Sequence, residues 1–191
     1  MNIRLLQTLQ DRESEPTALE DNGPYKCRKN HAWLTEGYYF WDTHIELGHW
    51  WGETIYGIGR YIICEAKAIL DVSCWDLQGN GAHRIELKDA CDLMVKSGIT
   101  TRERVKVPTV IQYLRENGLM KYNSVRALGV QSMSDKSSFY YALPFPGNNN
   151  GRKPAYLEIH PAVQVCLFER TALSLRSFKI VYPEHYCEEY V

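Results

Sequence analysis

The sequence predicts an α+β domain. Segments typical of strands lie near both ends of the chain, and two amphipathic helical segments lie between them, whereas a doubly wound parallel sheet would alternate strands and helices throughout. The chain has 191 residues and contains no repeat, low-complexity tract or linker-like stretch. Because one domain commonly takes about 100–200 residues, we expect a single domain over residues 1–191.

The first half of the chain contains segments of both kinds. The expected elements are a strand over residues 1–10, a helical turn over 17–20, a strand over 37–41, a helix over 42–51 and a strand over 60–66. The strands carry alternating or β-prone residues, most clearly in the aromatic run that starts at Gly37. We expect Thr17 to cap the helical turn, and Asp42 and Thr43 to cap the longer helix.

The second half begins with two helices and ends with strands. The expected elements are helices over residues 86–97 and 107–116, then strands over 124–129, 156–159, 163–168 and 177–182. Both helices show apolar residues at the three-to-four spacing of one buried face, and Gly98 and Gly118 end them. Residues 131–153 are rich in Pro, Gly and Asn, so we expect a long loop or flap there.

Composition and charge exclude several classes of protein. The chain is 45% hydrophobic and 24% charged, which is typical of a folded domain and excludes a disordered or fibrous chain. A formal net charge of -1 removes the electrostatic argument for a strong nucleic-acid binder. No stretch approaches the ~18–20 apolar residues of a membrane helix, and the start does not resemble a signal peptide. We expect a cytoplasmic protein with no membrane partner.

The six cysteines are widely spaced and favour free thiols in a reducing compartment. Cys64, Cys91 and Cys166 lie among apolar neighbours, so we expect them to be buried. A zinc site is the alternative, with ligands drawn from Cys27, His31, His44 and His49. Their spacing matches no established zinc motif, so we predict no metal.

Aromatic residues are concentrated between positions 33 and 51. They are Trp33, Tyr38, Tyr39, Phe40, Trp41, Trp50 and Trp51. Strand alternation places Tyr39 and Trp41 on one face and Tyr38 and Phe40 on the other. One face is explained by a core. The other needs either a second layer of the protein or a flat aromatic ligand held between rings.

Residues 37–40, followed by a helix and by His49-Trp50, resemble the Gly-x-Tyr-Phe…Ala-x-Tyr segment of poly(ADP-ribose) polymerases and diphtheria-toxin-type ADP-ribosyltransferases. The spacing from Tyr39 to Trp50 is that of the family, with Trp replacing the second Tyr. Residues 33–41, 123–126 and 163–167 also resemble a group of bacterial proteins with this fold. The resemblance implies an ADP-ribosyltransferase-like fold of split antiparallel sheets with flanking helices.

The resemblance also implies that NAD is the ligand. In the family, the first Tyr and a second aromatic residue enclose the nicotinamide ring, a role that falls on Tyr39 and Trp50, with Gly37 and Tyr38 beside them. Arg126 is a candidate for contacting the pyrophosphate of NAD or an acidic residue. The alternative for Arg126 is an exposed surface cation.

Two family positions are changed in this sequence. Gln7 and Thr8 stand where the family has His or Arg followed by Gly or Thr, which hold the amide and ribose of NAD. Gln164 stands at the position of the catalytic Glu. A glutamine can orient the ribose, but it lacks the charge that stabilises an oxocarbenium ion. Glu158 is a possible substitute, whereas Glu169 is expected to face the other way. The alternative for Gln164 is a solvent-facing strand position.

These features predict an NAD-dependent mono-ADP-ribosyltransferase, or an NAD glycohydrolase, with Gln164 and Tyr39 in the catalytic site. The acceptor would be a protein or a nucleic acid, and the habit of such enzymes suggests a toxin or conflict-system effector. One alternative is a catalytically silent module of the same fold that binds NAD or ADP-ribose. Another is a protein whose aromatic cluster is only core.

Overall fold

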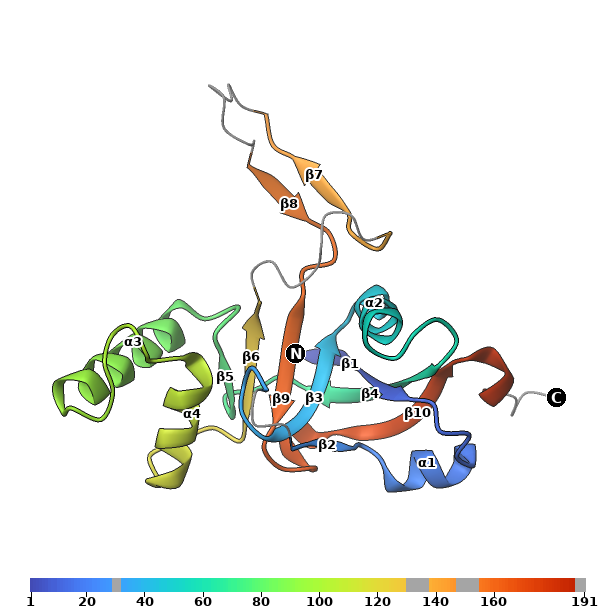
Figure 1. The fold of residues 1–191 in the computed structure, drawn as a ribbon, viewed down its shortest axis with the longest axis horizontal. Helices are drawn as coiled ribbons and strands as arrows, with labels where there is room; N and C mark the ends of the chain where they lie inside the picture. Colours follow the sequence, from blue (N-terminus) through green and yellow to red (C-terminus); the bar gives the residue numbers. More distant parts are fainter. Residues whose placement is uncertain (29–31, 130–137, 147–154, 188–191) are drawn as a thin grey trace.

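The computed structural model describes residues 1–28, 32–129, 138–146 and 155–187, and it confirms the α+β class. Most strands join one sheet, in the order β10-β4-β1-β3-β9-β6-β5, with β2 paired to β3 (Figure 1). These strands are β1 Asn2–Gln10, β2 Lys26–Cys27, β3 Gly37–Asp42, β4 Tyr61–Ile69, β5 Cys74–Asp76, β6 Ser124–Leu128, β9 Val163–Leu167 and β10 Arg176–Tyr182.

In the middle of the sheet, strands β1 and β3 are paired over only a short length. Strands β1 and β4 are paired along their whole length, from Asn2 opposite Ile69 to Gln10 opposite Tyr61. By contrast, β1 and β3 are in register only at the end of β3, where Leu5 and Leu6 lie opposite Asp42 and Trp41. All pairs in this sheet are antiparallel except β5 and β6.

Four α-helices are seen in the described residues, at different parts of the sheet: α1 Pro16–Asn22, α2 Ile45–Ile55, α3 Gly81–Lys96 and α4 Val107–Glu116. Helix α2 packs against β1 and β4, α1 lies beside β10, and α3 and α4 lie together at the β5–β6 end (Figure 1). A small hairpin, β7 Ala142–Pro144 with β8 Tyr156–Glu158, projects away from the sheet. The described residues also include two short 3-10 helices, Ala172–Ser174 and Glu184–Tyr186.

The core occupies both faces of the sheet. Tyr38 and Phe40 of β3 pack with Leu5 and Val165 in one cluster. Trp41 packs in a second cluster under α2, and Tyr39 borders a third cluster that includes Ile111 of α4. The alternation expected for the aromatic strand is therefore confirmed, and much of its aromatic surface is core.

Several boundaries differ from the sequence predictions. Glu15, not Thr17, caps α1 with its side chain. Helix α2 begins after His44 and continues to Ile55, so Asp42 and Thr43 do not cap it. Helix α3 begins at Gly81 behind an Asn80 cap, five residues before the expected start. Helix α4 has the predicted bounds.

Two other expectations changed. Part of the loop expected over residues 131–153 is strand β7, and residues 130–137 and 147–154 lie outside the described residues. All six cysteines are free, as expected, and Cys64 and Cys166 are buried, but Cys91 is only half-buried. Within the described part of the chain, none of the helices has the length and apolar character needed to cross a bilayer.

Candidate functional site

A cavity of about 420 Å³ opens over the strands β1 and β3. We call it the aromatic cavity. Its aromatic lining is Tyr25, Trp33, Tyr39, Phe40, Trp41, Trp51 and Tyr56. Three cationic residues also line it, Arg12, Lys26 and Arg28. Rings suit a flat aromatic ligand, and guanidinium and ammonium groups suit phosphates, so the lining combines the two chemistries that a nucleotide presents.

A second, larger cavity of about 880 Å³ adjoins the first. The two share Ala32, Trp33 and Gln164 in their linings, and the larger one extends toward α3 and α4 through residues that include Arg84 and Lys106. Gly129 leaves room for the Trp33 ring at this junction, because a Cβ on residue 129 would lie within 3.0 Å of the indole ring. A ligand longer than one ring system could extend from one cavity into the other.

Gln164 lies at the junction of the two cavities. It is on β9, opposite Trp41 of β3 and Ala127 of β6, and is only 9% exposed. Its Oε1 is buried and has no hydrogen-bond partner among the described residues. A buried acceptor without a donor costs about 1–3 kcal/mol. Gln164 is therefore not the solvent-facing residue of the alternative interpretation, and its oxygen is available to a donor on a ligand.

Gln7 and Thr8 line the aromatic cavity, but their side chains already have partners. The Nε2 of Gln7 donates to the carbonyls of Tyr25 and Tyr39 at 2.8 and 3.2 Å, and its Oε1 accepts from the Tyr25 N–H at 2.8 Å. The hydroxyl of Thr8 donates to the carbonyl of Gly48 in α2, at 3.0 Å. Both residues shape the wall by fixing the segment around Tyr25 and the helix α2.

Tyr39 points its ring at the aromatic cavity while its hydroxyl is anchored elsewhere. The hydroxyl accepts from the Leu34 N–H and donates to the Thr35 carbonyl, both at 2.7 Å. Burial, with a smaller contribution from the neighbouring Cys166, raises the pKa of Tyr39 well above its usual value. The phenol therefore stays protonated near neutral pH and fixes the orientation of the ring.

The expected ring partner of Tyr39 is not at the aromatic cavity. Trp50 packs edge-on against Trp41, with ring centroids 6.0 Å apart, and does not line the cavity, whereas its neighbour Trp51 does. Successive residues of a helix point about 100° apart, so a one-residue difference decides which ring faces the cavity. The sequence spacing predicted the helix but not which of the two tryptophans faces the cavity.

Gly37 and Tyr38 are structural. A Cβ on Gly37 would lie within 3.0 Å of both the Cys166 thiol and the Leu167 carbonyl, so glycine lets β3 approach β9. Tyr38 packs in the core cluster on the opposite face of the sheet. Neither lines the aromatic cavity.

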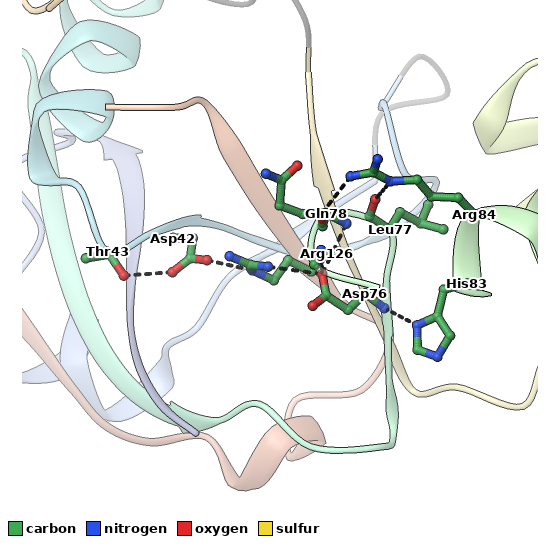
Figure 2. A network of polar contacts seen from close by, with 9 residues as sticks. Asp42, Thr43, Asp76, Leu77, Gln78, His83, Arg84 and Arg126 are labelled. Atoms are coloured by element: carbon green, nitrogen blue, oxygen red, sulfur yellow. Dashed lines mark hydrogen bonds and ion pairs between the residues drawn. The ribbon is translucent and has the colours of Figure 1, made fainter. Parts of the chain in front are cut away.

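Arg126 belongs to an ion-pair network (Figure 2), and its side chain is only 16% exposed, so it is not an exposed surface cation. Its Nε donates to Asp42 at 2.7 Å and its Nη1 donates to Asp76 at 3.0 Å. Thr43 donates to the other oxygen of Asp42 at 2.8 Å. Asp76 also accepts from the Gly79 N–H at 2.8 Å and so holds the turn before α3. The contact with acidic residues, one of the two expected roles, is present.

No Asp or Glu is among the described residues that line either cavity. Glu158 belongs to the projecting hairpin and Glu169 is exposed beyond the end of β9. Neither Glu158 nor Glu169 therefore supplies the carboxylate that Gln164 lacks. Of the zinc ligands considered from sequence, His31 lies outside the described residues, and the described Cys27, His44 and His49 do not form a cluster of ligand atoms with one another. Nδ1 of His49 is hydrogen-bonded to the Tyr61 hydroxyl at 2.9 Å.

Sequence reasoning missed Arg12, Arg28 and Tyr56, which come to the aromatic cavity from separate loops or loop-flanking positions. None of the three belongs to a periodic apolar pattern: Arg12 and Arg28 lie in polar segments, and Tyr56 lies just after the end of α2. Searches against models of protein families, curated proteins and solved structures find no match to this chain.

Proposed function

We propose that this chain binds NAD in the aromatic cavity and across the junction with the larger cavity. The observation that carries the proposal is the buried Oε1 of Gln164, which has no partner among the described residues and lies where the two cavities meet. A ribose hydroxyl or a carboxamide N–H would supply the missing donor. This role is the one that the family resemblance gives to the residue at this position.

The rest of the cavity supports the same ligand. Tyr39 and Trp51 are the rings proposed to hold the nicotinamide, since both line the cavity and the Tyr39 ring is fixed by its anchored hydroxyl. Arg12 and Arg28 are the proposed partners of the pyrophosphate. Stacking of one base on an aromatic side chain is worth about 1–3 kcal/mol, enough to decide micromolar against millimolar binding when two rings take part.

Two neighbouring tryptophans provide a matched test of the binding proposal. Trp51 lines the aromatic cavity, and Trp50 is its half-buried neighbour that does not. In calorimetric titrations with NAD, we expect Trp51→Leu to weaken binding by about tenfold or more and Trp50→Leu to leave it within about threefold. Equal losses in the two variants, or no heat of binding to the unmodified protein at millimolar NAD, would reject the cavity as the NAD site.

The fate of bound NAD separates two candidate functions. In the transferase candidate, nicotinamide leaves and ADP-ribose passes to a protein or nucleic-acid acceptor, with Gln164 orienting the ribose. In the second candidate the domain is a silent binding module. The absence of a carboxylate among the described lining residues favours the silent module, since a neutral amide cannot offset the charge that develops on the ribose.

Gln164→Glu distinguishes the two candidates. If the cavity is built as a transferase site with only the acid changed, restoring the carboxylate should speed nicotinamide release by about a hundredfold, the size expected for one electrostatic group at a transition state. Chromatography of NAD incubations measures the release, with water taking the place of the acceptor so that the products are nicotinamide and ADP-ribose. A Gln164→Glu protein that binds NAD and releases no nicotinamide favours the silent module, and Gln10→Glu on the exposed end of β1 is the control.

A further inference from the structure

Three potential metal ligands meet at the start of α2. His44 immediately precedes the helix, Glu46 is in its first turn, and His160 lies just before β9. One side-chain ligand atom from each residue lies within 4.8 Å of the other two. The imidazole rings of His44 and His160 are 5.1 Å apart between centroids, and Nε2 of His160 lies 3.9 Å from a carboxylate oxygen of Glu46.

The sheet register explains why residues so distant in sequence meet. Trp41 of β3 is opposite Gln164 of β9 in an antiparallel pair. His44 lies two residues beyond the end of β3, and His160 lies three residues before the start of β9. The end of β3 and the approach to β9 are thus brought together by the same strand pairing that builds the candidate site, and the first turn of α2 adds Glu46.

The hydrogen bond of His160 leaves the correct nitrogen available. Its Nδ1 lies 3.2 Å from the backbone carbonyl of Phe139. A carbonyl only accepts, so Nδ1 carries the hydrogen, and Nε2 of the neutral ring keeps its lone pair on the side that faces Glu46. Metal-binding histidines are commonly oriented by such a bond from their second nitrogen.

We propose that His44, Glu46 and His160 bind one Zn²⁺ ion, with water in a fourth position. Two imidazoles and one carboxylate form a ligand set that zinc uses where one coordination site stays open. In a tetrahedral zinc site, neighbouring ligand atoms are about 3.3 Å apart. Small rotations of these half-buried side chains would therefore complete the site, and their partial exposure gives the ion a path of entry.

The ion would connect two parts of the chain. It would fix the segment that leads into β9 to the first turn of α2. Strand β9 carries Gln164, and helix α2 carries Trp51 further along its length. This inference rests on the three ligands alone. It holds whether or not the aromatic cavity binds NAD, because metal binding is measured without any nucleotide.

The test uses the full chain without a histidine tag, stripped of metal with a chelator. After dialysis against micromolar Zn²⁺, mass spectrometry of the metal content should give one equivalent per chain. Co²⁺ as a spectroscopic probe should give the visible absorption of a low-symmetry, four- or five-coordinate ion. His160→Ala and Glu46→Gln should each weaken Zn²⁺ binding by at least about tenfold, the lower end of the loss caused by changes even beyond the direct ligands.

His185→Ala is the matched control, because His185 is an exposed histidine away from the cluster, and it should bind Zn²⁺ like the unmodified protein. Glu46→Gln preserves the shape of the side chain, and circular dichroism without metal checks that both variants are folded. Less than about a tenth of an equivalent in the unmodified protein, or equal binding in folded Glu46→Gln, would overturn the proposal.

Discussion

Arg126 donates to carboxylates on two other strands, Asp42 of β3 and Asp76 of β5. The side chains of Arg126, Asp42 and Asp76 are 16%, 7% and 18% exposed, so the two carboxylates flank the guanidinium in a largely buried place. Without the guanidinium, both carboxylates would lose a strong donor and repel each other.

We therefore expect Arg126→Gln to lower the free energy of unfolding by about 3 kcal/mol, the usual cost of breaking a buried ion pair from one side. Urea denaturation at pH 7 measures the change. Arg104→Gln, at an exposed position, should change it by less than about 0.5 kcal/mol. A similar small effect for Arg126→Gln would mean that the network contributes little to stability.

His49 should make the fold sensitive to acid. Burial lowers the pKa of His49, and the nearby Glu53 and Glu46 only partly oppose this. The unfolded chain, with a pKa of about 6.5 for this group, then binds the proton more tightly than the folded one. The contribution is complete above about pH 6.5 and is lost as the pH falls below it.

We expect the stability of His49→Gln to fall less steeply than that of the unmodified protein between pH 7 and pH 5. Thermal unfolding in the presence of a chelator measures both slopes, so that metal binding does not enter the comparison. Parallel slopes in the two proteins would contradict the assignment.

At the scale of single residues, the sequence located positions better than roles. It singled out Gln164 and Tyr39, which both line the aromatic cavity, and it indicated an acidic partner among the roles of Arg126. It could not tell that Asp42 ends a strand and pairs with Arg126 instead of capping α2, because the partner lies 84 residues away along the chain. Long-range pairs leave no local pattern.

At the scale of elements, helix α2 lies close to the sheet because of two glycines one turn apart. Gly48 meets Ile63 and Thr8, and Gly52 meets the ring of Tyr61. This approach lets the Thr8 hydroxyl reach the Gly48 carbonyl and brings Trp51 to the aromatic cavity. A larger residue on this helix face would move the wall of the cavity.

We expect Gly52→Ala to destabilise the fold by about 1–3 kcal/mol, because its Cβ would overlap the Tyr61 ring. Gly81→Ala is the matched control. It lies in the first turn of α3 with nothing within 4 Å of the added carbon, so it should be neutral or slightly stabilising. Chemical denaturation of both variants compares them, and equal effects would show that α2 is not held at a tight approach.

Elements with a periodic pattern were predictable, and short or exposed ones were not. The bounds of α4 followed from apolar spacing, and the strand β9 was predicted from its short apolar run to within one residue. Strand β5 has three residues, too few for any period, and forms because Trp75 is buried beside the parallel partner β6. The first turn of α3 lacks the apolar stripe, since most of that helix is not buried.

At the scale of the whole molecule, the thiols divide into two sets. Cys64, Cys74 and Cys166 are buried, and the other three are half-buried. Burial raises the pKa of Cys166 to about 12 and that of Cys74 to about 11, which keeps these sulfurs in the unreactive thiol form.

We expect a thiol reagent at pH 8 to modify up to three cysteines in the native protein and all six after denaturation, since every cysteine is free. Mass spectrometry of the intact protein counts them, and peptide mapping should place the early modifications on Cys27, Cys91 and Cys187. Fast modification of Cys166 would show that β9, and with it the setting of Gln164, is not buried in solution.

The class of the fold followed from the order of elements, but the pairing of the strands within the sheet did not. The α+β class needs only the sequence of strands and helices. The meeting of the two cavities at Gln164 depends on the pairing of β9 with both β3 and β6, and therefore on contacts between distant parts of the chain. No pattern in a single sequence contains that information.

Binding of NAD in the aromatic cavity is best tested by a proton NMR time course of NAD with the purified protein. We expect broadening of the nicotinamide signals that Trp51→Leu abolishes and Trp50→Leu preserves. Free nicotinamide appearing over time would show that the protein cleaves NAD, whereas broadening without release would favour the silent module or a transferase that needs its acceptor. Sharp, unchanged nicotinamide signals at millimolar NAD and high protein concentration would rule out NAD as the ligand and leave the aromatic residues as core alone.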